Sequence, residues 1–137
     1  MNVLYATRKW LRDECPLIDR GNRFNANYLG ADATEYTLRT SGESHRQNLW
    51  GADIATHDLV FEAVMSYGTA TAPNIAAADF FAGLSAWVRG AAAAHNCPTV
   101  PGYEVDSLTV SNAGLITTAT AATARYQLQI KLVLKER

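Results

Sequence analysis

Three histidines and two cysteines are the residues of this chain best suited to metal or nucleophilic chemistry, and their spacing supports neither. His45, His57 and His95 fall in three different predicted elements, and none belongs to an HExxH-type motif. A zinc site would have to combine His95 and Cys97 with remote partners, and ligands two residues apart at a helix end are not typical of zinc sites. We expect no metal site, and we expect His95 to be a cation near a helix C-terminus.

No other motif indicates catalysis or cofactor binding. The chain contains no GxGxxG, GxxxxGK[ST] or GxSxG sequence, and no serine or cysteine stands in a recognisable nucleophile context. The paired carboxylates Asp13-Glu14 lie on the solvated face of a predicted helix. Trp10 and the basic residues around it are explained by the same amphipathic helix, without a nucleic-acid ligand. We therefore predict no catalytic residues, no cofactor and no enzymatic activity.

The composition favours one globular domain, 1–137, that belongs to an assembly. The chain has 137 residues, 48% of them hydrophobic and 18% charged, with a net charge of -1. These values exclude global disorder and lack the basic excess of a duplex-binding protein. A charge near zero gives little self-repulsion, which suits a subunit of a larger structure.

Neither a signal peptide nor a membrane span is expected. The N-terminal residues are charged where a signal peptide needs an apolar core, and the weakly polar stretch 75–94 contains Asp79 and Arg89. Cys15 and Cys97, each followed by proline, are expected to be reduced and buried. These features predict folding in a cytoplasm and no contact with membrane.

Local patterns predict an α+β fold. Apolar residues at helical spacing predict a helix over 3–15, and segments 24–29, 35–40 and 54–68 are typical of strands. Asn74 is the expected N-cap of a second helix reaching Ala94. A hairpin is expected over 103–118, with its turn at 112–114, and the alternation over 125–135 predicts a final strand. The result is a mostly antiparallel β-sheet with two helices packed on one face. The expected core is Leu4, Leu11, Phe80, Leu84, Trp87, Leu128, Ile130 and Leu132.

Several segments, taken in order along the chain, resemble a family of small tailed-bacteriophage proteins. The opening LRDECPLID, the pair NANYLG and EYTL, the helix FFAGLSAWV and the close TATAATARYQLQIKLVLKE are similar to that family's elements. Its members are known as minor capsid or tail-terminator proteins, and some carry a chloramphenicol-resistance label. The sequence has no acyl-transfer or phosphoryl-transfer motif, so that label is rejected. Segment 40–56 does not match the family, and strand 59–67 lacks its aromatic-rich pattern.

The resemblance implies a tail-terminator-like structural protein of the virion neck. Such a protein caps the tail tube as a hexameric ring, joins it to the head-completion or connector protein, and lets viral DNA pass through its lumen without specific binding. It would assemble in the host cytoplasm and reside in the tail or neck of the virion. A ring needs unlike patches on each subunit, for which the final strand and alanines 91–94 are candidates. Alternatives are a head-completion stopper, a tail-tube subunit or, from another class, a host small-molecule-binding domain.

Segment 41–53 is predicted to be a long loop that mediates assembly. It lacks periodicity, and loops of this length in compact domains are usually functional or disordered. It contains His45, Arg46 and Trp50, and Trp and Arg are enriched at interface hot spots. The functional interpretation has the loop order against a neighbouring subunit or the tail tube. The alternative is a flexible excursion whose Trp50 folds back on its own domain.

Overall fold

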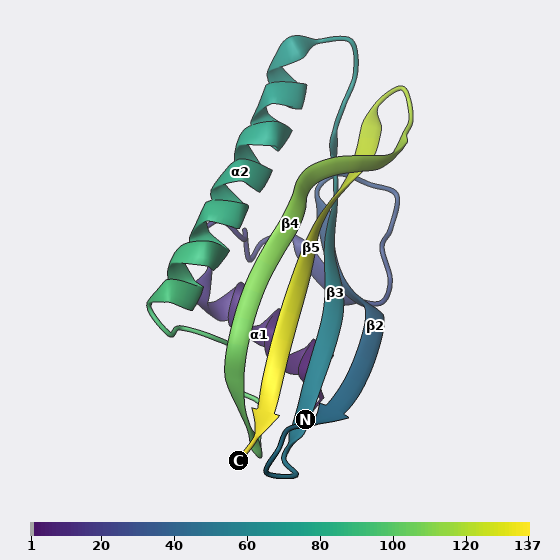
Figure 1. Ribbon diagram of the computed structural model, residues 1–137. Coiled ribbons are helices and arrows are strands. Elements are labelled where there is room, and N and C mark those ends of the chain that lie inside the picture. The colour runs from purple at the N-terminus through teal and green to yellow at the C-terminus, as the bar shows by residue number, and fades with distance from the viewer. Residues whose placement is uncertain (1) are drawn as a thin grey trace.

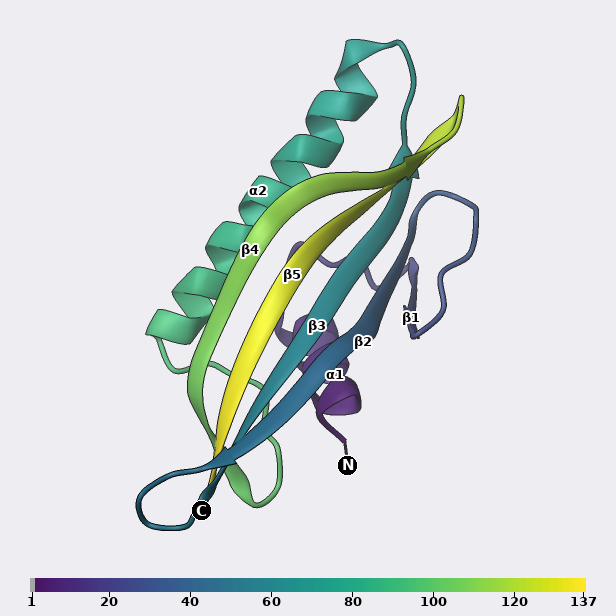
Figure 2. The same cartoon turned by 45° about the vertical axis from the view of Figure 1, so that its right-hand side comes forward.

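The computed structural model describes residues 2–137 and has an α+β architecture (Figure 1). Its elements are α1 (Val3–Glu14), β1 (Arg23–Ala26), β2 (Glu35–Gln47), β3 (Asp53–Ser66), α2 (Thr71–Ala93), β4 (Tyr103–Ala119) and β5 (Thr123–Glu136). The strands form one sheet in the order β1-β2-β3-β5-β4. Every neighbouring pair is antiparallel except β1 with β2. Both helices lie on one face of this sheet, as predicted (Figures 1 and 2).

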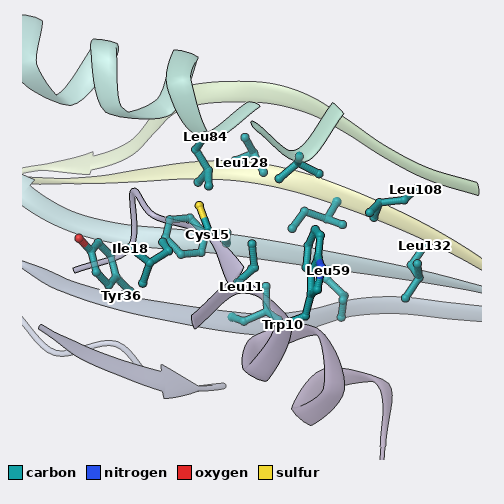
Figure 3. Packing of buried hydrophobic residues seen from close by; sticks show 14 of the residues in the cluster. Trp10, Leu11, Cys15, Ile18, Tyr36, Leu59, Leu84, Leu108, Leu128 and Leu132 are labelled. Atoms are coloured by element: carbon teal, nitrogen blue, oxygen red, sulfur yellow. The ribbon is translucent and has the colours of Figure 1, made fainter. Parts of the chain in front are cut away.

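The core lies between the two helices and the sheet (Figure 3). Five of the eight predicted core residues are fully buried, namely Leu11, Leu84, Leu128, Ile130 and Leu132. Leu4, Phe80 and Trp87 pack against the core but are only partly buried. The buried stripe of α2 is Ala77, Phe81, Leu84, Val88 and Ala91. Its helical phase therefore runs through Phe81 rather than Phe80.

The start of α2 differs from the prediction. The helix begins at Thr71, one turn before the expected site, and Ala70 at the N-cap position makes no side-chain cap bond. Asn74 lies inside the first turn, where its Nδ2 donates to the Gly68 carbonyl at 2.8 Å and its Oδ1 accepts from the Gly68 N–H at 3.3 Å. Asn74 therefore fastens the β3–α2 connection instead of capping the helix. Pro73 does not block the earlier start, because first-turn N–H groups have no helical partner.

The end of α2 is fastened to α1. His95 takes a left-handed φ of 60°, and the Asn96 N–H donates to the Ala91 carbonyl at 2.8 Å. This bond and the left-handed residue are typical of a Schellman C-cap. The Asn96 side chain also accepts from the Trp10 indole N–H at 3.2 Å, and the Trp10 ring lies 5.1 Å from that of Trp87. The two helices are thus joined at this end.

The predicted long loop 41–53 is wrong. β2 continues to Gln47 and pairs with β3 over nearly its full length, so only residues 48–52 form a turn. The cause is a β-bulge, since Thr40 pairs with Leu59 and Gly42 pairs with Asp58, leaving Ser41 as an extra residue. An extra residue reverses the phase of inward and outward side chains, so a single period-2 pattern no longer describes the strand.

The predicted hairpin over 103–118 is also wrong. β4 is one continuous strand, and its register with β5 shifts between Ser111 and Leu115. Asn112 and Gly114 take φ values of 53° and 81° at that irregularity, which bends the strand without reversing it. The reversal comes at 120–122, before β5, where the Thr120 N–H donates to the Thr123 carbonyl at 2.8 Å.

The final strand, expected to supply a contact patch, is an interior strand of the sheet. β5 is paired with β3 on one side and with β4 on the other. Its alternation is as predicted, because the side chains facing the helices are buried, namely Tyr126, Leu128, Ile130, Leu132 and Leu134. No edge of β5 is free to pair with a neighbouring subunit, so its contribution to an interface is limited to outward side chains.

Candidate assembly surface

The three predicted interface residues lie at one end of the β2–β3 hairpin, which projects beyond the helices (Figure 2). His45 and Arg46 are adjacent on β2, level with Ala55 and Ile54 of β3. Because successive strand residues point to opposite faces, His45 lies on the helix side of the sheet and Arg46 on the other side. Trp50 lies in the turn beyond them. The structure brings the three to one end of the molecule but not into one pocket.

The turn at the hairpin end is held by Asn48. Its side-chain Oδ1 accepts from the Trp50 N–H at 2.9 Å and from the Ala52 N–H at 3.0 Å. Its backbone carbonyl accepts from the N–H of Gly51, whose φ of 79° suits glycine. These bonds define the backbone of residues 48–52. A partner would therefore meet a formed turn rather than having to order a long loop.

The side chains at this turn are uncovered. Leu49 is 98% exposed and Trp50 is 89% exposed. The alternative in which Trp50 folds back on its own domain is wrong. These two adjacent large apolar side chains stand exposed on an anchored turn, which we call the hairpin tip (Leu49 and Trp50).

A group of ionisable side chains lies on the helix side of the sheet at the base of the hairpin tip. We call Glu43, His45, Asp53, His57 and Tyr103 the hairpin cluster. His45 bridges two carboxylates, with Nδ1 3.0 Å from Asp53 Oδ2 and Nε2 3.3 Å from Glu43 Oε2. His57 Nδ1 lies 3.2 Å from Glu43 Oε1, and the Tyr103 hydroxyl donates to Asp53 Oδ2 at 3.1 Å. The cluster links β2, β3 and β4.

The two histidines of the hairpin cluster have opposite tendencies to bind a proton. Hydrogen bonds to Asp53 and then Glu43 raise the pKa of His45 above its ordinary value. Burial lowers the pKa of His57, although Glu43 acts in the opposite direction. The hydrogen bond with His45 lowers the pKa of Asp53, and the bond to Asp53 raises the pKa of Tyr103. His45 is therefore the more readily protonated of the two imidazoles.

Sequence reasoning missed the hairpin cluster because it placed His45 in a loop and His57 in a separate strand. Glu43 and His57 are direct cross-strand partners, and the two imidazole rings lie 6.3 Å apart. The signal that identifies the pairing is the Asn48–Gly51 turn between two segments of strand-forming residues. Among residues 2–137, no three His, Cys, Asp or Glu side chains are placed to hold a metal ion.

The groove beside α1 offers no activated nucleophile. It measures 390 Å³ and lies between α1 and the segment that follows α2, with Lys9, Trp10, Asn96 and Cys97 in its lining. Burial raises the pKa of the Cys97 thiol, and the reactive form of cysteine is the thiolate. Cys15 is buried and its pKa is raised for the same reason, whereas Cys97 is only partly buried, so the prediction that both are buried is confirmed for Cys15 and wrong for Cys97. Both cysteines are free thiols.

Comparison with known proteins identified no relative of this chain. No protein-family model matches the sequence, and no curated protein matches it. Neither helix within residues 2–137 is long and apolar enough to cross a membrane. The functional inference therefore depends on the resemblance of the segments described above and on the surface that the fold presents.

Proposed function

We propose that this protein is a structural virion protein of the head–tail junction of a tailed bacteriophage. In this role it is a tail terminator that forms a hexameric ring, caps the tail tube and joins it to the head-completion or connector protein. The order of family-like segments along the whole chain supports the proposal, and so does the α+β domain with both helices on one face of the sheet.

The exposure of the hairpin tip is the strongest structural support for this proposal. Leu49 and Trp50 are almost fully exposed on a turn that Asn48 holds in place. Tryptophan is among the residues most enriched at interface hot spots, and an exposed apolar pair is stabilised when a partner covers it. In a ring whose strands run along its axis, the hairpin tip lies at one axial end. We assign it to docking on the tail tube or the connector.

The face of the sheet without helices is suited to line the channel. Arg39 of β2 donates to Glu62 of β3 at 2.5 Å, and Gln127, Gln129 and Lys131 of β5 lie on the same face. Lys131 is exposed and Arg39 and Gln129 are partly so, whereas Glu62 and Gln127 are buried, as are the apolar Val60 and Val64 of β3 on this face. The exposed groups form neither a large apolar patch nor a basic stripe that would grip DNA. In the proposed ring, viral DNA passes this face without specific binding.

Electron microscopy of the purified protein tests the role. A terminator gives discrete six-subunit rings, or monomers that form such rings at the end of a tail tube. Open tubes that lengthen with protein concentration would instead identify a tail-tube subunit. Monomers that bind neither tail tubes nor connectors would contradict a role at the junction.

A further inference from the structure

The sheet has two open edges. β1 covers β2 only from Glu35 to Leu38, and Asn27 extends that cover by accepting from the Thr40 N–H at 3.1 Å. Within the described chain, no strand pairs with residues 41–47 on that side. β4 lies at the opposite edge of the sheet and has β5 as its one strand neighbour. Open edges present unpaired backbone donors and acceptors to other chains.

The two open edges lie at the same level of the sheet. Through the registers of β3 and β5, Ser44 of β2 is level with Ser107 of β4, and Arg46 is level with Glu104. Asp106, the extra residue of a bulge, falls between the two β4 positions. β2 and β4 also run in opposite directions, because three successive antiparallel pairings separate them. A copy that is related to this one by rotation about an axis parallel to the strands therefore presents its β2 antiparallel to β4 of this copy. Neither copy has to be turned end over end.

We infer that residues 41–47 of one copy pair with residues 103–109 of the next, so that the sheet continues from subunit to subunit around the ring. The inference rests on the proposed ring and identifies its lateral contact. A ring closes by rotation without translation along its axis, and each subunit uses two different patches. With strands running along the axis, residues at the same level of the two open edges meet.

Charge supports this pairing. Arg46 and Glu104 are both exposed and lie on the face of the sheet without helices. Among the described residues neither forms an ion pair within its own subunit. The proposed register places them directly opposite each other. Opposite charges at such positions stabilise an antiparallel ladder and like charges destabilise it, so the pair also selects this register.

Paired serine-to-cysteine substitutions test the register. The variant Ser44→Cys/Ser107→Cys carries two thiols separated by three strand spacings within one subunit, about 14 Å. This distance is too long for a disulfide within the subunit. In the proposed ring they meet between subunits, so mild oxidation should give a ladder of covalent species that ends at the hexamer. The matched control is Ser44→Cys with Ser111→Cys, which moves the second thiol about 13 Å along β4 on the same face and should give no ladder.

The outcomes separate the contact from the function. Rings seen by electron microscopy with no ladder from Ser44→Cys/Ser107→Cys would overturn the edge pairing and leave the terminator role standing. Failure of the unmodified protein to form rings, alone or on tubes, would overturn both. Covalent dimers from either single-cysteine variant would indicate twofold edge pairing and contradict the inference. As a second measure, Arg46→Glu and Glu104→Arg should each reduce ring formation, and the double exchange should restore it.

Discussion

Replacing Trp50 with alanine should weaken docking of the protein while leaving its fold intact. The side chain is 89% exposed, so only about a tenth of roughly 250 Å² is buried in the free subunit. At about 25 cal/mol per Å², its contribution to the free energy of unfolding is about 0.6 kcal/mol or less. Burial of the remaining surface by a partner would supply up to about 6 kcal/mol before the costs of association are subtracted. We expect docking to weaken by at least about 1 kcal/mol, roughly a fivefold rise in Kd.

The assay compares thermal unfolding with co-sedimentation on tail tubes of the same phage. Trp87→Ala is the matched control, because Trp87 packs on Trp10 at 5.1 Å and is only partly exposed. Its removal should destabilise the fold by about 2 kcal/mol, less than for a fully buried Trp. A Trp50→Ala variant that unfolds as readily as Trp87→Ala yet docks normally would refute the assignment of the hairpin tip.

Three further predictions concern the core, the hairpin cluster and the cysteines. Leu84→Ala should lower the free energy of unfolding by about 2–5 kcal/mol in denaturant titrations, since the side chain is fully buried; a change of a few tenths would contradict the packing of α2. NMR titration should give His45 a pKa above, and His57 a pKa below, the ordinary value of about 6.5. The contribution of His45 to the free energy of unfolding is then complete below pH of about 6.5 and is lost as the pH rises through its raised pKa. The contribution of His57 is complete above pH of about 6.5 and is lost as the pH falls through its lowered pKa. In Asp53→Asn the pKa of His45 should return towards its ordinary value while the pKa of His57 stays low, because a hydrogen bond raises the first and burial lowers the second. Cys15 and Cys97 should show no two-hydrogen mass deficit, and in the folded protein the buried Cys15 should react with alkylating reagents more slowly than the partly buried Cys97.

The parts of the fold that follow one regular pattern could be predicted from the sequence. The final strand alternates from Arg125 to Lys135 with Val133 as its one exception, and the helix through Leu84 and Val88 repeats at helical spacing. Both lie where the patterns place them. The sequence does not fix which face of α2 is buried, because Phe80 and Phe81 are adjacent and an apolar stripe can pass through either. Both rings lie near Phe61, but Phe81 also packs against Tyr126 of β5 and is the one that is fully buried.

The two errors in strand assignment occur where the backbone departs from regular geometry. The bulge at Ser41 made one long strand resemble a short strand followed by a loop, and the irregularity near Gly114 made another resemble a hairpin. In both cases the local residues are typical of turns, and only pairing with a distant strand shows that the chain continues. The hairpin cluster was missed for the same reason, since Glu43 and His57 meet only when β2 is extended through the bulge.

Growth of the tail tube in the presence of the protein tests the terminator role most directly. Tail-tube protein of the same phage is allowed to polymerise, and this protein is added at increasing concentration while tube length is measured by electron microscopy. Tubes should stop growing and carry one six-subunit ring at a single end, with the hairpin tip at an axial end of the ring. Tubes that continue to lengthen, or that incorporate the protein along their walls, would contradict the terminator role.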